Sequence, residues 1–140
     1  MSSYADSSVI VPLYVAEGFT TKSLSLTRGR APFPFTPWHR LEVRNAIRSL
    51  VSTTEAKSSI HSIEEDLRAK TLIEHRALDW TDCLRRAEEI SRDLNAGINA
   101  SSPDLFHVAC AVEMGFTEFL TFDERQSRLA KSAGLKVKGL

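Results

Sequence analysis

A chain of 140 residues can bury the core of one domain without disulfides, so we expect residues 1–140 to form a single domain. Its 18 basic and 18 acidic residues balance, as is ordinary for a soluble globular protein. The longest apolar run, Val9–Ala16, contains a proline and is too short to span a bilayer, and no basic segment precedes it to make a signal peptide. We therefore expect a cytoplasmic protein with no membrane contact.

The first half of the chain predicts two short strands and four helices. In chain order these are a strand at 2–6, a helix from Ser7 that Gly18 punctuates, a helix at 20–28, an edge strand at 32–35, a helix from Thr36 through Leu50, and a helix from a Thr54 cap to about Lys70. The expected buried stripe of the third helix is Val43, Ala46, Ile47 and Leu50.

The second half continues the alternation of strands and helices. We expect an extended segment at 71–78, a helix from an Asp79 cap to Leu94, a loop at 95–101, a helix from Ser102 that Gly115 stops, a strand at 119–122, a helix at 124–132 and a strand at 135–137. The apolar face expected for the helix at 79–94 consists of Trp80, Leu84, Ala87, Ile90 and Leu94.

The alternation of strands and helices indicates the α/β class, with a mainly parallel sheet covered on both faces. Ligands of such sheets bind beyond the carboxyl ends of the strands. The two cysteines, Cys83 and Cys110, have no CxxC partner and no histidine at zinc-ligand spacing, so we interpret them as reduced thiols in or near the core.

Four acidic residues occupy positions where a site could form. Asp6 and Asp123 follow predicted strands, and Glu42 and Asp104 lie early in predicted helices. Four carboxylates gathered at one sheet edge would need a counter-charge, which a hard divalent metal ion supplies. Each acid alone also has a structural explanation, either as a helix cap or first-turn acid or, for Glu42, as an ion-pair partner of nearby arginines.

The zero net charge conceals an uneven distribution along the chain. Residues 18–53 carry six basic residues against Glu42 alone, a net charge of +5, whereas residues 54–104 carry seven basic and eleven acidic residues, a net charge of −4. A basic stretch around a site carboxylate would suit a polyanionic substrate, although a solvated helical face has the same composition.

Taken together, four motifs resemble the PIN-domain family, and more closely its VapC-type toxin branch. They are Asp6-Ser7-Ser8 with the apolar segment that follows, Thr36-Pro37 through Leu41-Glu42-Val43-Arg44-Asn45-Ala46, Pro103-Asp104-Leu105-Phe106-His107-Val108-Ala109, and Leu120-Thr121-Phe122-Asp123. The resemblance covers essentially the whole chain. The polar first strand, Ser2-Ser3-Tyr4-Ala5, departs from the family pattern.

The resemblance implies a three-layer α/β/α PIN-like domain and a Mg²⁺- or Mn²⁺-dependent ribonuclease. It implies the toxin of a type II toxin–antitoxin pair, a homodimer that cleaves structured RNA such as tRNA or rRNA and is held inactive by a cognate antitoxin, with DNA bound only through that antitoxin. Asp6, Glu42, Asp104 and Asp123 match the family's acidic positions. Asp6 and Asp104 would bind metal directly and Asp123 would bind metal or position water, whereas Glu42 would bind a second metal or act as general base.

Five further residues near the acids are secondary candidates. Ser8 and Thr121 could hold a ligand or water, His107 could contact RNA or orient Asp104, and His39 and Arg44 could contact phosphate. Capping, helix packing and surface roles are the respective alternatives. Two other functions stay open: a housekeeping PIN nuclease in RNA maturation, and a non-catalytic PIN module in a DNA-bound autorepressing complex.

Overall fold

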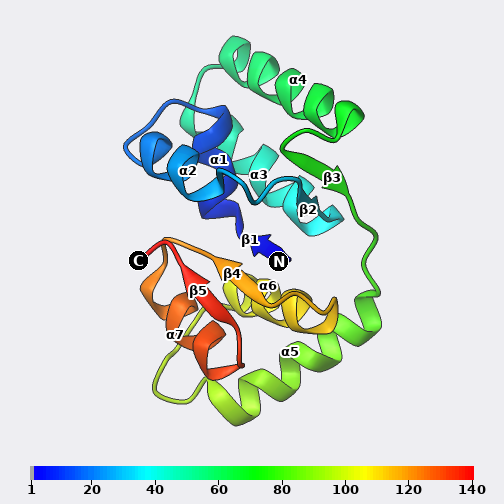
Figure 1. Ribbon diagram of the computed structural model, residues 1–140, viewed down its shortest axis with the longest axis vertical. Helices are drawn as coiled ribbons and strands as arrows, with labels where there is room; N and C mark the ends of the chain where they lie inside the picture. The colour runs from blue at the N-terminus through cyan, green and yellow to red at the C-terminus, as the bar shows by residue number, and fades with distance from the viewer. Residues whose placement is uncertain (1) are drawn as a thin grey trace. The chain divides into compact units, whose positions relative to one another are not determined.

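The computed structural model describes residues 2–140, which fall into two compact units that we treat separately (Figure 1). Unit 1 combines the segment up to Asp6 with Leu78–Leu140, and unit 2 comprises Ser7–Ala77. Unit 1 contains β1 (Ser3–Ala5), α5 (Trp80–Leu94), α6 (Ser102–Glu113), β4 (Glu118–Leu120), α7 (Glu124–Ser132) and β5 (Lys136–Lys138). Unit 2 contains α1 (Ser7–Tyr14), α2 (Thr20–Thr27), β2 (Phe33–Phe35), α3 (Pro37–Leu50), α4 (Thr53–Ala69) and β3 (Ile73–His75).

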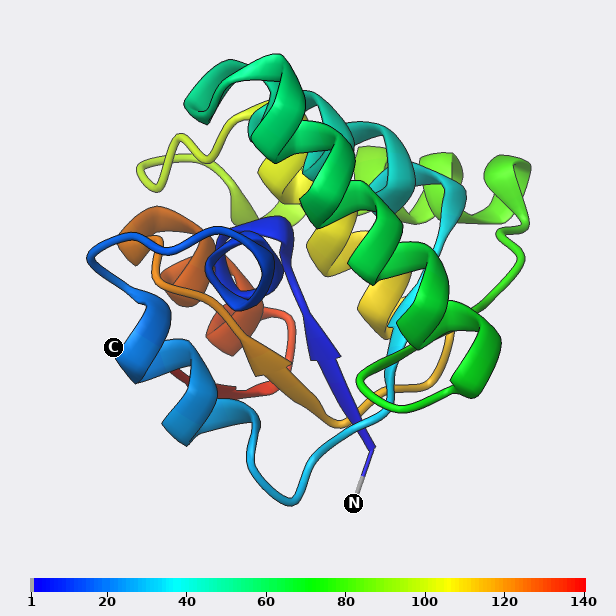
Figure 2. The same ribbon diagram turned by 90° about the horizontal axis from the view of Figure 1, so that it is seen from above.

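Every strand pairing is parallel, as the alternation of strands and helices predicts. Unit 1 has the strand order β1-β4-β5, and unit 2 pairs β2 with β3. Figure 2 shows β1 beside β4, both running in the same direction. Parallel strands are joined by helical crossovers, which is why each three-residue strand is separated from its partner by at least one helix.

The polar first strand is stabilised by one large buried residue. Tyr4 stacks on Phe119 of β4 with ring centroids 5.6 Å apart, and meets Phe116 edge-on at 5.8 Å. Its hydroxyl lies 2.7 Å from Nδ1 of His107 on α6. Tyr4, Phe119 and His107 are almost completely buried, so β1 is fixed by the packing of one aromatic side chain rather than by a run of apolar residues.

Most helices begin where their capping residues predict, and one does not. Thr36, Asp79 and Asp123 each accept a hydrogen bond from a backbone N–H in the first turn of α3, α5 and α7. The predicted Thr54 cap of α4 is wrong, because Ser52 Oγ accepts from Glu55 N at 3.2 Å and the helix begins at Thr53. Ser52 and Glu55 have the serine–x–x–glutamate spacing of a helix start, which fixes the earlier boundary.

Two predicted apolar faces are partly wrong. Leu50 of α3 is 57% exposed, and on α5 Leu84 is 56% and Trp80 44% exposed. Cys83 takes the place of Leu84 in the buried stripe of α5. One face of the Trp80 ring nevertheless packs against protein, since it stacks on Phe106 of α6 at 5.7 Å.

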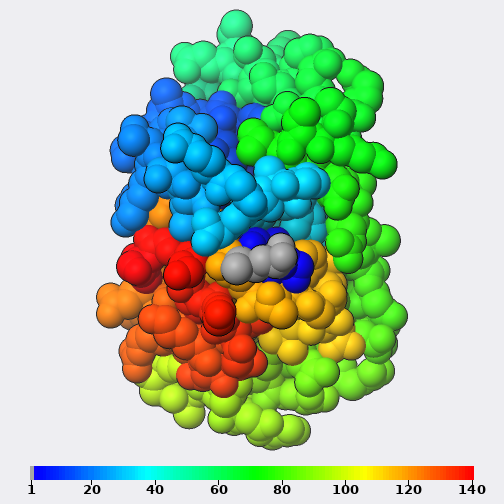
Figure 3. Space-filling view, in the orientation of Figure 1, coloured from blue at the N-terminus to red at the C-terminus, as the bar shows by residue number. Residues whose placement is uncertain are grey.

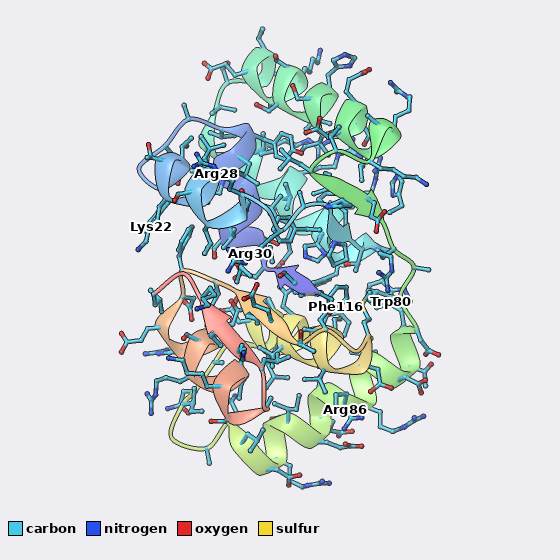
Figure 4. The ribbon with its side chains drawn as sticks, in the orientation of Figure 1. Lys22, Arg28, Arg30, Trp80, Arg86 and Phe116 are labelled. Carbon is cyan, nitrogen blue, oxygen red and sulfur yellow. The ribbon has the colours of Figure 1, made fainter. Side chains whose placement is uncertain are left out.

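Helices α5 and α6 pack against one another in unit 1. Arg86 on α5, labelled in Figure 4, donates from Nε to Glu113 Oε2 of α6 at 2.9 Å. Between the helices, Cys83 and Cys110 are free and buried, and burial raises the pKa of both thiols. This agrees with their interpretation as core thiols.

Strand β5 closes the edge of the unit 1 sheet. The N–H of Thr121 donates to Lys138 O at 3.1 Å. Gly139 follows with φ +119°, and a Cβ added there would overlap the carbonyl oxygen of Thr121. Only glycine therefore fits at this position. Figure 3 shows α7 and β5, in orange and red, at the surface of the molecule.

In unit 2, α1 packs against α2, α3 and α4. The Tyr14 hydroxyl on α1 donates to Asp66 Oδ2 of α4 at 2.6 Å, and Ser59 Oγ donates to the Tyr14 carbonyl at 2.8 Å. Burial, followed by the hydrogen bond and charge of Asp66, raises the pKa of Tyr14 well above its ordinary value. Among residues 2–140, no helix is long and apolar enough to cross a membrane.

We expect Tyr14→Phe to lower the free energy of unfolding at neutral pH by about 1 kcal/mol, because one partly buried hydrogen bond is lost. In the unfolded chain tyrosine ionises near pH 10, whereas folded Tyr14 keeps its proton to higher pH. The folded state then binds the extra proton, so wild-type stability falls as pH rises above about 10. Urea unfolding at about pH 9 and pH 11 should show that the free energy of unfolding falls less between these two pH values for Tyr14→Phe than for wild type.

The matched control is Ser59→Ala, which removes the neighbouring hydrogen bond but no titrating group. It should lower stability equally at both pH values. If the free energy of unfolding of Tyr14→Phe fell as much between about pH 9 and pH 11 as that of wild type, ionisation of Tyr14 would not be the cause.

Candidate functional site

Asp6 lies at the carboxyl end of β1, where the sequence places it. Its N–H donates to Leu120 O at 3.1 Å, which continues the β1–β4 pairing, and its residue surface is 3% exposed. Thr121, the residue after β4, is fully buried and its Oγ1 lies 3.2 Å from Asp6 Oδ2. Parallel pairing thus brings the two strand ends, and these two side chains, to the same edge of the sheet.

The Thr121 hydroxyl connects three groups. Its Oγ1 is 2.6 Å from Gln126 Oε1 and 3.2 Å from Asp6 Oδ2, and it accepts from Asp123 N at 3.0 Å. A hydroxyl has one proton, which cannot be donated fully to both acceptors. The shorter distance makes Gln126 the closer acceptor, and the hydrogen bond to Asp6 is the longer of the two.

Gln126 is the residue that sequence reasoning missed. It is fully buried at the start of α7, and each of its polar groups is engaged. Nε2 donates to Asp104 O at 3.0 Å, Oε1 accepts from Thr121, and the backbone N–H donates to Asp123 Oδ1 at 2.7 Å. The Gln126 amide therefore links Thr121 to the segment of Asp104, the Gln126 backbone N–H binds Asp123, and Thr121 in turn contacts Asp6. Asp123-x-x-Gln126 has the spacing of a helix start, but that pattern does not indicate that the amide is buried.

Asp104 and Asp123 both stand at helix N-termini in unit 1. Asp104 lies in the first turn of α6, where Ser101 Oγ accepts from its N–H, and Asp123 is the N-cap of α7. Both residues are half-buried. Asp104 as a first-turn acid and Asp123 as an N-cap each have a structural role, and hydrogen bonds from Gln126 reach both segments.

Glu42 lies half-buried on α3 in unit 2. Its hydrogen-bond partner is Ser7, which is not among the candidate residues predicted from the sequence. Ser7 Oγ donates to Glu42 Oε1 at 2.8 Å. Ser7 directly follows Asp6 in the chain, so Glu42 is fixed to the residue next to the first acid. Ser8, the serine we did select, is exposed.

The remaining secondary candidates have structural partners. His39 is fully buried and completes the capping box of α3, with Nδ1 3.1 Å from Thr36 N and 2.9 Å from Thr36 Oγ1. His107 is buried against Tyr4. Arg44 Nη1 lies 3.9 Å from Glu64 Oε1 on α4. These contacts give the three residues roles in α3, in the unit 1 core and between α3 and α4, and their proposed functional roles stay predictions.

The candidate side chains of unit 1 (Asp6, Asp104, Asp123 and Thr121) and of unit 2 (Glu42) each offer oxygen atoms alone, which suit Mg²⁺ or Mn²⁺ rather than a softer metal. Across residues 2–140, however, no three His, Cys, Asp or Glu side chains are already gathered closely enough to hold an ion. The residues therefore suit a hard cation in the kind of donor atom that they offer, and their role as metal ligands stays a prediction.

Comparison with known proteins gives a family and a fold. The family model described as PIN domain matches residues 4–132. A structure described as VapBC2 from Rickettsia felis bound to a DNA fragment from their promoter has a TM-score of 0.71 at 13% identity, over 99% of this chain and 98% of the other. A structure described as FitAcB from Neisseria gonorrhoeae has a TM-score of 0.65 at 13% identity, over 96% and 95% of the two chains.

No curated protein sequence matches the chain. The family match and the two structural likenesses confirm the predicted fold class, α/β with a three-layer α/β/α architecture and a short parallel sheet. The resemblance found in the four motifs is confirmed with it.

We expect Thr121→Val to lower the free energy of unfolding by about 1–3 kcal/mol, because Gln126 Oε1 and the Asp123 N–H lose their partner in a buried region. Thr121→Ser keeps the hydroxyl and should retain most of that stability. Urea unfolding of both variants measures the difference. The control Thr54→Val, at an exposed position of α4, should change little, and equal losses in the valine and serine variants at position 121 would refute the hydrogen-bond account.

Proposed function

The chain belongs to the PIN domain family, and on that premise we propose that it is a metal-dependent endoribonuclease acting as the toxin of a type II toxin–antitoxin pair. PIN domains are generally nucleases and typically use divalent metal ions. The single observation that carries the proposal is the buried Thr121–Gln126 network. It joins the segments of Asp6, Asp104 and Asp123 at the carboxyl edge of the unit 1 sheet, where α/β folds bind ligands.

Asp6 and Asp104 would hold the cation, with Asp123 as a third ligand or a positioner of water. A bound divalent ion would lower the pKa of a water molecule and offset negative charge on the phosphate. Thr121 and Gln126 fix the backbone and side-chain positions of these acids. Asp123 uses Oδ1 to cap α7, so Oδ2 is the oxygen that we assign to the ion or its water.

Glu42 would bind a second ion or act as the general base. Its Oε1 accepts the Ser7 hydroxyl, which fixes the orientation of the carboxylate. As general base, Glu42 would receive the proton of the attacking water at Oε2. Ser7 is then a positioning residue for Glu42 in the same way that Gln126 is one for the acids of unit 1.

The proposed partners are an antitoxin, an RNA and a second copy of the chain. Two features support the antitoxin: the likeness over nearly the whole chain to VapBC2 and FitAcB, and the promoter DNA named with VapBC2. We propose structured RNA, such as tRNA or rRNA, as the substrate, with DNA reached only through the antitoxin and with the cytoplasm as the compartment. The promoter complex also favours one alternative, a non-catalytic module of a DNA-bound repressor. RNA cleavage by the isolated chain separates the two.

The test of the proposed function is Asp6→Asn. Loss of one negative ligand should lower Mg²⁺- or Mn²⁺-dependent RNA cleavage by about 100-fold or more, since metal charge stabilisation is worth several kcal/mol. Mapping RNA ends after expression, with and without the neighbouring open reading frame, identifies the RNA and the antitoxin.

The control is Asp93→Asn, which removes the same charge at an exposed ion pair on α5 and should cleave normally. Wild-type cleavage by a folded Asp6→Asn protein would remove Asp6 from the site. A wild-type protein that binds promoter DNA with its antitoxin but never cuts RNA would instead favour the non-catalytic module.

We further expect Gln126→Met to weaken Mn²⁺ binding by about 10–100-fold, because methionine fills a similar volume but cannot hold Asp104 O and Thr121 Oγ1. Isothermal titration with Mn²⁺ in the absence of RNA measures the effect. Thr121→Ser, which keeps the hydroxyl, should bind Mn²⁺ nearly as tightly as wild type. Unchanged Mn²⁺ affinity in a folded Gln126→Met protein would limit Gln126 to a structural role.

A further inference from the structure

A groove of about 490 Å³ lies between α3 and α4 within unit 2. Arg44 and Arg48 of α3 line one side, and the other side is formed by residues of α4, namely Thr53, Ala56, Lys57, Ile60 and His61. Its volume lies within the range of about 300–1,000 Å³ that is typical of small-ligand sites. Only the two residues Val51 and Ser52 separate α3 from α4, so the end of α3 and the first turns of α4 form a corner.

The groove carries three permanent positive charges and no lining carboxylate. Three acids of α4 lie near the groove without lining it. Glu55 accepts from Ser52 Oγ at 3.3 Å, Glu64 pairs with Arg40 at 2.8 Å and with the groove residue Arg44 at 3.9 Å, and Glu65 pairs with Arg68 at 2.6 Å and with the groove residue His61 at 3.6 Å. In the described part of the chain, no carboxylate forms an ion pair with Arg48 or Lys57. Cations held together in this way repel one another, and an anion in the groove would relieve the repulsion.

Arg44 is the groove cation that is partly paired within unit 2. Its Nε is buried and has no hydrogen-bond partner within residues 2–140. Glu64 Oε1 is close enough for an ion pair with Arg40 and Arg44, but the geometry makes no hydrogen bond to either. The Arg44 side chain is 26% exposed and lines the groove, so its charge is available to an oxyanion bound there.

The apolar part of the lining favours a nucleotide over a simple ion. Ala56 is buried and Ile60 half-buried, and both lie between the cations of the two helices. Cations above an apolar surface can bind the phosphate of a nucleotide while its sugar or base covers the apolar residues. A peptide made of acidic residues alone would satisfy the cations but would place no ring on that surface.

The groove is also separate from the side of α3 that carries Glu42. Each helical residue turns the side chain by about 100°, so Arg44 and Arg48 lie about 200° and 240° around α3 from Glu42. Glu42 faces Ser7 of α1, whereas Arg44 and Arg48 face α4. A phosphate bound in the groove would therefore occupy a different position from any phosphate bound beside Glu42.

We propose that the α3–α4 groove binds a phosphate-bearing nucleotide of the RNA substrate, at a position away from the bond that is cut. The proposal rests on the proposed function for the identity of the ligand as RNA, and on the groove itself for the phosphate chemistry. Unit 2 as a whole supports it, because its ten Lys and Arg residues exceed its seven Asp and Glu residues, a net charge of +3. The basic residues of α2 and the following segment, Lys22, Arg28 and Arg30, belong to the same unit (Figure 4).

The test compares two double variants in an Asp6→Asn background, so that the RNA is bound without being cut. Arg48→Gln with Lys57→Gln removes two groove cations, and Arg128→Gln with Lys131→Gln removes two exposed cations of α7 as the matched control. Fluorescence anisotropy with a labelled RNA hairpin, between about 50 and 200 mM salt, gives the affinity and its salt dependence. We expect the groove variant to bind about tenfold more weakly and to lose about 1.5–2 units of the log–log salt slope, and the control to change little.

A second measurement does not depend on RNA. Inorganic pyrophosphate, titrated into the ¹⁵N-labelled full chain, should shift amide signals of residues 53–61 in wild type and not in the groove variant. If pyrophosphate leaves these signals unchanged, or if both double variants bind the hairpin alike, the groove is not a phosphate site. A glutamate-rich peptide that shifts the same signals when pyrophosphate does not would assign the groove to an acidic protein partner and overturn the proposal.

The two measurements also separate this inference from the proposed function. Groove-dependent binding of hairpin and pyrophosphate by a protein that never cleaves RNA would leave the groove in place and remove the nuclease. If wild type cleaves RNA, but hairpin affinity and pyrophosphate-induced shifts do not depend on Arg48 and Lys57, the nuclease is kept and the groove is removed as a phosphate site.

Discussion

The parallel pairing of β1 with β4 is the constraint on which the candidate site depends. Ser3, Tyr4 and Ala5 pair with Glu118, Phe119 and Leu120, and this register brings the next residues, Asp6 and Thr121, side by side. Strands of three residues contribute few backbone hydrogen bonds, so side chains must hold the register. Tyr4 does this by stacking on Phe119, and Ser3 does it by donating to the buried Glu118 carboxylate at 2.6 Å. A slip by one residue would expose Tyr4 and separate Asp6 from Thr121.

The buried polar network at this edge fixes the segments that carry three of the candidate acids. Thr121 and Gln126 are completely buried, and their polar groups are satisfied mainly by one another and by the backbone of Asp104 and Asp123. Such a network rigidifies a site when every member is satisfied, and destabilises it when one partner is lost. In unit 2, the Ser7–Glu42 hydrogen bond similarly fixes the orientation of one candidate carboxylate.

Local signals were enough to predict the class of fold and most helix starts, because these depend on residues close together in sequence. The same signals selected the four candidate acids, whose role as a site stays a prediction. Thr36-Pro37, Asp79 and Asp123 each specify a helix start through their own side chains. Leu84 and Leu50 could not be placed from periodicity, because their exposure depends on which neighbouring helix covers which face. Gln126 and Ser7 were missed for a related reason. A glutamine in a first turn and a serine after an aspartate are common, and only the tertiary contacts to Thr121, Asp104 and Glu42 give them a role.

Gly139 shows how far the influence of the candidate site extends along the chain. Gly139 lies far in sequence from three of the candidate acids, Asp6, Glu42 and Asp104. Its location near the end of the chain would by itself suggest that substitutions are tolerated. Yet it combines a left-handed backbone with direct contact to the carbonyl of Thr121, the residue whose hydroxyl organises the acids. Any side chain there must displace either β5 or Thr121. We therefore expect a substitution at position 139 to disturb the candidate site through the main chain of Thr121.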